Sequence, residues 1–375
     1  MAGANTSLEA GFLTLSNGKI VVENGATLRI PHDANERGLT GRALLQAGIG
    51  EEADRGEILV RGENAKFESR TLSLANRSRA SLEIRDGGQV VTFGDASTAG
   101  GETAETTVLI RDRKSEWQIG GGATFGRRGK SDVVIDGGRL SVRRGITLAA
   151  DEGAVSRLEL RRGVLDLHGS DLEIGNGSGT FVFSGGEFHG LQSFDGDLLQ
   201  ESGLFVPASS EPAEISGGFT LGESARVELE IGKIEFQNDA ALQVAGNVDL
   251  QGVIGVALSD GYERAAGDSF SVLSANSPLD LSRVEVDFVG FGGHALLSHD
   301  QRSLIVTLPN FGDSDLDGRC DSSDLVRVFQ AGQYEDEVSG NSTWLTGDWN
   351  GDREFDSSDL VVAFTSSRWE PERSV

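Results

Sequence analysis

The chain has 375 residues, of which 52 are glycine and only 6 proline, and its formal net charge at pH 7 is -26. A hydrophobic fraction of 37% is too high for a disordered chain, and the strong negative charge argues against nucleic acid as the main partner. The single cysteine, Cys320, excludes an intrachain disulfide and a cysteine-based zinc site.

The first residues, MAGANTSLEAGFLTLSNGK, show neither the basic start nor the apolar core of a signal peptide. Taken literally, this absence indicates a cytoplasmic protein. The alternative is that the true start lies upstream of this sequence, because a strand-like pattern is already present at Phe12. No apolar run reaches the length that spans a bilayer, and we expect no membrane span. The calcium-binding pattern described below nevertheless favours an extracellular or cell-surface protein.

From Gly11 to about Leu308 the sequence consists of short alternating segments separated by Gly, Asn, Asp and Ser. Gly18–Ile30 and Arg226–Ile231 are examples. Alternation of apolar and polar residues between turn residues predicts half-buried strands. The region is therefore expected to be mainly β.

Five of these segments align with one another. The alignment places five apolar residues in one column, at spacings of 26, 25, 25 and 23: Ile84, Ile110, Ile135, Leu160 and Phe183. A fixed period near 25 residues predicts stacked coils that bury an apolar face against their neighbours. We predict a right-handed parallel β-solenoid over residues 1–190, with about three strands per coil. A β-sandwich is the alternative, while a propeller blade needs about 40 residues.

After Gly190 the period weakens although the segments stay strand-rich. Residues 191–308 are predicted to form irregular coils or a β-rich cap, because an uncovered last coil would template aggregation. Within them, VAGNVDLQGVIGVALSDG resembles the closing segment of bacterial autotransporter-like repeat proteins.

The middle of the predicted solenoid is basic, with 16 Lys and Arg against 12 Asp and Glu between Arg70 and Arg162. Two interpretations stay open: a strip that binds an anionic polysaccharide, or solvated turns whose arginines pair with acids one coil away. The candidate strip residues are Arg85, Arg111, Arg127, Arg128, Arg143, Arg144, Arg161 and Arg162. His168 and His189 are interpreted as turn residues, and no catalytic residue is assigned.

Two acidic segments, Gly312–Phe329 and Gly347–Phe364, match at most positions and lie 35 residues apart. Each places oxygen-bearing side chains at positions 1, 3, 5, 9 and 12 of a 12-residue loop, the pattern that supplies the six to eight oxygens of a calcium ion. The backbone carbonyl of position 7 completes each set. The predicted ligands are Asp313, Asp315, Asp317, Arg319, Asp321 and Asp324 in the first loop, and Asp348, Asn350, Asp352, Glu354, Asp356 and Asp359 in the second.

Each loop is followed by a helical pattern, and neither is preceded by one. A duplicated loop with one helix resembles the type I dockerin module, over about Phe311–Trp369. The resemblance implies two calcium ions and binding to a cohesin-like or surface scaffold protein. It also implies that loop positions 10 and 11 contact that partner; these are Ser322, Ser323, Ser357 and Ser358.

Two features depart from the dockerin pattern. The segment between the copies, QAGQYEDEVSGNSTWLT, is longer than usual, and Arg353 stands where Gly318 allows the sharp turn of the first loop. A left-handed residue other than glycine costs on the order of 1 kcal/mol, so we expect the second calcium site to be the weaker one. Position 8 is apolar in such loops. Because Cys320 occupies this position in the first loop, we predict that it is a buried, inert thiol.

The sequence thus predicts a non-enzymatic structural or attachment protein, with the solenoid over 1–190, the cap over 191–308 and the dockerin-like calcium module over 309–375. The alternative is a carbohydrate-active enzyme, a polysaccharide lyase or glycoside hydrolase, whose tail delivers it to a scaffold. Carboxylates and a base gathered in one groove of the solenoid would favour the enzyme.

Overall fold

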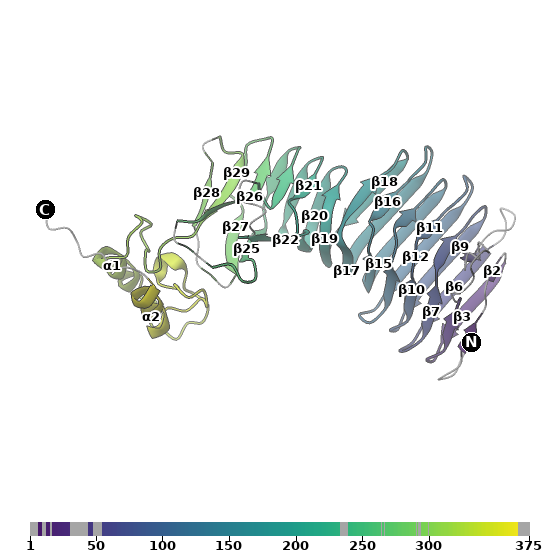
Figure 1. Cartoon of the computed structure of the whole chain (residues 1–375), viewed down its shortest axis with the longest axis horizontal. Coiled ribbons are helices and arrows are strands. Elements are labelled where there is room, and N and C mark those ends of the chain that lie inside the picture. The colour runs from purple at the N-terminus through teal and green to yellow at the C-terminus, as the bar shows by residue number, and fades with distance from the viewer. Residues whose placement is uncertain are drawn as a thin grey trace, which may run out of the picture. The chain divides into compact units, whose positions relative to one another are not determined.

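The computed structural model describes residues 7–9, 13–15, 17–30, 44–47, 55–232, 239–263, 265, 267–289, 291, 294–298 and 300–366. The protein is mainly β, with a β-solenoid of about 8 turns and two short helices near the C-terminus (Figure 1). The predicted solenoid fold is confirmed, while its right-handed winding remains a prediction. Two compact units, Met1–Arg226 and Val227–Val375, are described separately.

The first unit contains β1 (Ser7–Glu9), β2 (Leu13–Leu15), β3 (Gly18–Glu23), β4 (Thr27–Arg29), β5 (Leu44–Ala47), β6 (Arg55–Arg61), β7 (Lys66–Ser69), β8 (Thr71–Leu74), β9 (Arg79–Arg85), β10 (Gln89–Thr92), β11 (Ala96–Thr98), β12 (Glu105–Arg111), β13 (Glu116–Ile119), β14 (Ala123–Phe125), β15 (Lys130–Val142), β16 (Ile146–Leu148), β17 (Val155–Ile174), β18 (Ser178–Phe183), β19 (Glu187–Phe194), β20 (Leu198–Val206) and β21 (Ala213–Ile215). The remaining elements are β22 (Phe219–Ile231), β23 (Leu242–Val244), β24 (Val248–Leu250), β25 (Val253–Leu258), β26 (Ser269–Ala275), β27 (Glu285–Val289), β28 (His294–Leu297), β29 (Ser303–Thr307), α1 (Ser322–Ala331), the 3-10 turn η2 (Trp344–Thr346) and α2 (Ser357–Ser366).

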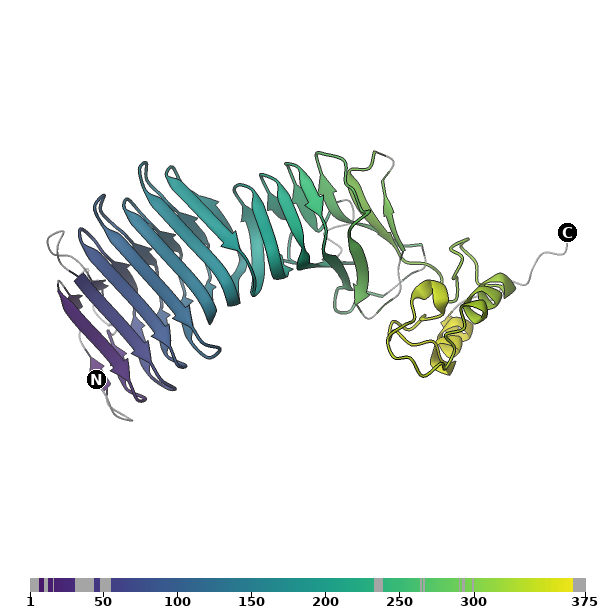
Figure 2. The same cartoon turned by 180° about the vertical axis from the view of Figure 1, so that it is seen from behind.

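In the first unit each strand pairs in parallel with a strand of the next coil, so that three faces run along the stack. One face contains β3, β6, β9 and β12, the next β4, β7, β10 and β13, and the third β5, β8, β11 and β14. The longer strands β15 and β17 bend around corners and contribute to more than one face. Figure 2 shows the same stack from behind. This parallel pairing excludes the β-sandwich alternative.

The apolar column predicted from the repeat is confirmed residue by residue. Ile84 is in register with Ile110, Ile110 with Ile135, Ile135 with Leu160, and Leu160 with Phe183. All five side chains are at most 1% exposed. Because a strand buries every second side chain, β9 and β12 on this face each bury three side chains, and this column is one of three that fill the interior there.

Glycines at the corners let neighbouring coils approach each other closely. Gly163 has φ +91, and a Cβ added there would lie 2.1 Å from the carbonyl oxygen of Gly138 one coil earlier. Gly153 has a similar φ of +81 but nothing within 4 Å of the added atom. The two positions therefore separate the cost of a left-handed backbone from the cost of a clash.

We expect Gly163→Ala to lower the free energy of unfolding of the solenoid by about 2–4 kcal/mol, because a backbone carbonyl cannot move aside without shifting a coil. Gly153→Ala is expected to cost only about 1 kcal/mol. Urea unfolding followed by far-ultraviolet circular dichroism measures both. Equal losses for the two variants would show that the coils do not approach each other as described.

The second unit departs from regular parallel coiling. β25 pairs in parallel with β27, and β23 with β26, but β29 runs antiparallel to both β26 and β28. An antiparallel return strand ends the parallel stacking and covers an edge that would otherwise be open to other chains. No helix among the described residues is long and apolar enough to cross a membrane.

Candidate metal centre

The two acidic loops are built around one small hydrophobic core. Its buried members come from both copies and from the segment between them: Val328, Trp344, Trp349, Phe355 and Ala363. Helices α1 and α2 follow the two loops as the sequence predicts, and they begin at loop position 10. Cys320 is 3% exposed at the position equivalent to Phe355, in agreement with its predicted buried role.

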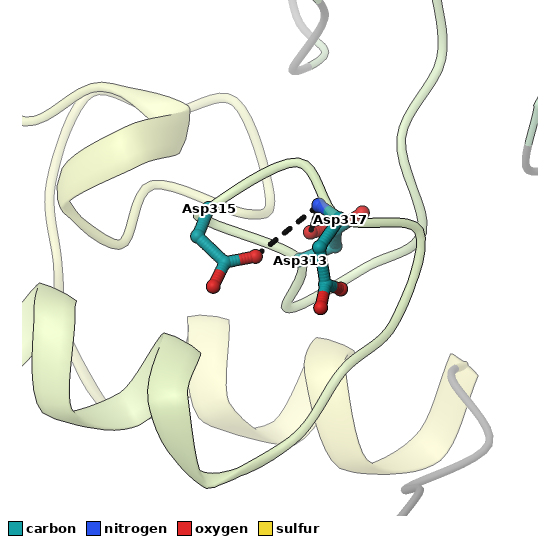
Figure 3. A group of neighbouring side chains, drawn as sticks. All are labelled: Asp313, Asp315 and Asp317. Carbon is teal, nitrogen blue, oxygen red and sulfur yellow. Dashed lines mark hydrogen bonds between the residues drawn. The ribbon is translucent and has the colours of Figure 1, made fainter.

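In the first loop three carboxylates gather on one turn (Figure 3). Asp313, Asp315 and Asp317 each present an oxygen, and these oxygens lie within 4.8 Å of one another. Backbone amides fix their orientation: the Gly318 amide donates to Asp313 Oδ2 over 3.0 Å, and the Asp317 amide donates to Asp315 Oδ1 over 3.2 Å. The predicted ligands at positions 1, 3 and 5 are thus brought together.

The second loop repeats these contacts position by position. The Arg353 amide donates to Asp348 Oδ2 over 3.0 Å, as Gly318 does to Asp313, and the Asp352 amide donates to Asn350 Oδ1 over 2.8 Å. Here the acidic oxygens that lie within 4.8 Å of one another belong to Asp348, Asp352 and Asp359. Two segments 35 residues apart therefore fold into the same loop.

The carboxylates of position 12 hold each loop closed. Asp324 accepts the amides of Ser314 and Asp321 over 2.7 and 2.9 Å. Asp359 accepts those of Trp349 and Asp356 over 2.8 and 2.9 Å. At position 9, Asp321 and Asp356 accept the amides of Ser323 and Ser358 and so cap the first turns of the helices. Positions 9 and 12 thus serve the loop and helix as well as any bound ion.

The carboxylates of positions 1 and 12 are buried, which is costly for charged groups without a compensating cation. Asp313, Asp324, Asp348 and Asp359 are 0–6% exposed, and none has an ion pair among the described residues. Burial, reinforced by the charges of neighbouring aspartates, raises the pKa values of Asp313 and Asp348 to about 6. Burial also raises the pKa values of Asp324 and Asp359.

By contrast, hydrogen bonds from Ser323 and Ser358 lower the pKa values of Asp321 and Asp356, which stay ionised. Each loop thus combines ionised carboxylates with buried ones whose negative charge a bound cation would compensate. Both sets offer oxygen atoms and no nitrogen or sulfur, which suits a hard divalent cation such as calcium. The residues present fit such an ion.

Arg353 occupies the left-handed conformation that the sequence analysis expects to weaken the second site. Its φ is 71°, close to the 88° of Gly318. Its guanidinium also lies 2.8 Å from Asp287 Oδ1 on β27 within the same unit. The ion pair offsets part of the backbone cost, but it also places a cation on the second loop.

We expect Arg353→Gly to tighten calcium binding at the second site about fivefold, because about 1 kcal/mol of backbone strain is relieved. The matched control is Gly318→Arg, which should weaken the first site by a similar factor. Calcium titration calorimetry of the full chain resolves both changes. Unchanged affinity in both variants would show that position 6 does not set the difference between the sites.

The long segment between the copies is part of the module core rather than a free linker. The Trp344 indole donates to the carbonyl of Asp313 over 2.7 Å, and Tyr334 forms a parallel bridge with Phe355. The short turn η2 directly precedes the second loop, where the sequence indicates no helical element. These contacts were not predicted from the sequence, although the aromatic residues Tyr334 and Trp344 in the segment were a signal for them.

Each helix presents an exposed face that the duplication makes nearly identical. Ser322 and Ser323 on α1 are exposed together with Val326 and Phe329, which are 55% and 48% exposed. On α2 the equivalent exposed residues are Ser357, Ser358, Val361 and Phe364. The hydroxyls of Ser323 and Ser358 bond back to Asp321 and Asp356 over 2.6 Å. The serines were predicted from the sequence as partner-binding residues, whereas the apolar residues beside them were not.

The arginines of the candidate strip fall into two groups. Arg85, Arg128, Arg161 and Arg162 pair with acids, for example Arg162 with Asp136 one coil earlier at 2.6 Å. The others have no ion pair among the described residues: Arg111, Arg127, Arg143 and Arg144. Arg127 and Arg144 line one groove of the solenoid and Arg143 another. The arginines of the candidate strip therefore do not line one common groove of the solenoid.

Comparison of the sequence with models of known protein families and with curated proteins finds no match. The functional assignment therefore depends on the geometry of these sites.

Proposed function

We propose that the C-terminal segment, residues 309–375, is a type I dockerin-like module that binds two calcium ions and attaches a right-handed β-solenoid arm to a cohesin-like or other surface scaffold protein outside the cell. The main support is the position-by-position agreement of the two loops, with the same amide bonds to the carboxylates of positions 1 and 12. The duplicated exposed helix faces supply the proposed docking surface.

The attachment surface is defined as Ser322, Ser323, Val326 and Phe329 on α1 and their equivalents on α2. Half-exposed valine and phenylalanine side chains are the kind of residue that partners bury, and serines at the helix start supply polar contacts. Because the two faces match, the module can present either one to the same partner. Calcium orders the loops from which both helices begin.

Binding of the full chain to a type I cohesin domain, in calcium and in EDTA, tests this proposal. We expect binding in calcium only. Val326→Asp or Val361→Asp alone should leave binding within about twofold, since the other face remains, whereas the double variant should lose more than about 30-fold. Val338→Asp, at an equally exposed valine outside these faces, is the control. Calcium binding without cohesin binding would overturn the dockerin assignment alone.

A second candidate function, a carbohydrate-active enzyme carrying this module, is favoured by one observation. Glu116, Arg139 and His168 line one groove of the solenoid, and Arg139 pairs with both Glu116 and Asp166. Glu116 is the one carboxylate among the described residues that line this groove, so the groove lacks the gathered carboxylates that would favour a lyase or glycosidase. Attachment is therefore the function that we propose first.

A further inference from the structure

A groove of about 550 Å³ opens on one outer face of the solenoid, within the unit Met1–Arg226. Its lining includes Phe93, Glu116, Arg139, Ser141, Arg143 and His168. The strands β13, β15 and β17 build its floor, because Gln118, Ser141 and Asp166 are in register across them. Residues 23 and 25 positions apart in the sequence thus become neighbours.

Two of these residues, Ser141 and Asp166, lie on either side of the His168 ring. Ser141 Oγ lies 2.7 Å from His168 Nε2. On the other side of the ring, His168 Nδ1 lies 3.5 Å from Asp166 Oδ1, and the same oxygen accepts the backbone amide of His168 over 3.0 Å. Asp166 Oδ2 accepts a hydrogen bond from Arg139. The carboxylate is therefore fixed between a guanidinium and the imidazole.

This order of groups is the one that activates a serine. With the Nδ1 proton facing Asp166, Nε2 is free to accept the hydroxyl proton of Ser141. The 3.5 Å separation is within the looser range found before substrate binds. The next coil supplies a comparison: His189 Nε2 lies 3.0 Å from Glu187 Oε2. The residue in register with Ser141 and Asp166 is His189 itself, so no serine occupies that register position in the next coil.

We propose that Ser141 and His168 are the nucleophile and general base of an ester hydrolase site, with Asp166 as the residue that positions His168. Ser141 Oγ attacks the ester carbonyl carbon as its proton passes to His168 Nε2. The bond from that carbon to the alcohol oxygen breaks, and the alcohol leaves with the proton. Water then attacks the acyl-serine, gives a proton to His168, and releases the carboxylic acid as Ser141 regains its hydrogen.

The groove lining indicates the class of ester. Phe93 is 60% exposed and offers a flat apolar surface on which a sugar ring can stack. Arg143 is exposed and has no ion pair among the described residues, so its charge is available to an anionic group or to the oxyanion that forms during attack. We assign the site to acyl esters of acidic carbohydrates. This goes beyond the attachment function and does not depend on calcium.

A fluorophosphonate probe, which labels activated serines, tests the assignment on the full chain in EDTA. We expect labelling at Ser141, identified by peptide mass spectrometry, and its loss in Ser141→Ala and His168→Ala. His189→Ala, which removes the histidine of the neighbouring coil, should keep it. No labelling of the wild-type chain, or labelling that survives both substitutions, would overturn the proposal.

Hydrolysis of p-nitrophenyl acetate supplies a second readout. The Ser141→Ala and His168→Ala variants should lose at least about 100-fold in kcat relative to His189→Ala. Asp166→Asn should lower kcat with KM unchanged, which a merely structural role would not produce, and Asp166→Glu should restore part of it. Equal rates in Ser141→Ala and His189→Ala, with unaltered circular dichroism, would contradict a nucleophilic Ser141.

Discussion

In the absence of calcium, the C-terminal module is expected to be more stable at pH 4.5 than at pH 7, and calcium is expected to reverse this order. The groups responsible are Asp313 and Asp348, whose pKa values are raised to about 6 by burial. The folded, metal-free module therefore holds these two protons more tightly than the unfolded chain does.

The sign follows from this difference. A carboxyl with a raised pKa contributes its stabilisation fully below the ordinary value near 3.8, and loses it as the pH rises through about 6. Each of the two groups should contribute on the order of 2–3 kcal/mol across this window. Calcium binds the deprotonated carboxylates, so its affinity should rise over the same range of pH.

Thermal unfolding between pH 4.5 and 7.5, in EDTA and in calcium, followed by tryptophan fluorescence, measures this crossing. The double variant Asp313→Asn with Asp348→Asn is the matched control, because the amides imitate the protonated carboxyls. In EDTA it should be as stable at pH 7 as the wild type is at pH 4.5, and calcium should have little effect on it. A wild-type module that gains stability in EDTA as the pH rises would refute buried, uncompensated carboxylates.

Replacing Trp349 with alanine is expected to destabilise the calcium module by about 3–5 kcal/mol. Trp349 is completely buried, and its indole donates to Ser314 Oγ over 3.0 Å. Ser314 occupies position 2 of the first loop, and Trp349 occupies position 2 of the second. A single side chain thus links the equivalent positions of both calcium loops, and its loss leaves a cavity between them.

Phe364→Ala is the control for this prediction, because Phe364 is 52% exposed on α2 and its loss should cost less than about 1 kcal/mol. Urea unfolding of both variants in calcium gives the two free energies. We also expect Trp349→Ala to weaken both calcium sites and not only the second. A loss confined to the second site would show that the loops fold independently.

The sequence was sufficient to predict features that repeat. The column from Ile84 to Phe183 could be predicted because every coil must bury a residue at that point, so the period appears in the sequence. The two calcium loops could be predicted because their oxygen spacing is fixed by the ion and occurs twice. Both predictions depend on local patterns that a single chain displays.

Contacts made once between distant residues could not be predicted in the same way. Ser141 and His168 are 27 residues apart, whereas the residue in register with Ser141 is Asp166, and His168 has a left-handed backbone that the repeat does not predict. The partner of Arg353, Asp287, is 66 residues away on β27. Aligning the sequence on the 25-residue period would have predicted that Ser141 and Asp166 are neighbours. It would not have predicted that the imidazole of His168 lies beside both of them.

Calorimetric titration of the full chain with calcium at pH 7 tests the central claim most directly. We predict two bound calcium ions per chain, the second more weakly held, and one fewer ion in each of the single variants Asp313→Ala and Asp348→Ala. Asp336→Ala, which removes a half-buried carboxylate outside both loops, should bind two. An absence of calcium binding by the wild-type chain, or binding that is unchanged when both Asp313 and Asp348 are replaced, would contradict a duplicated calcium module.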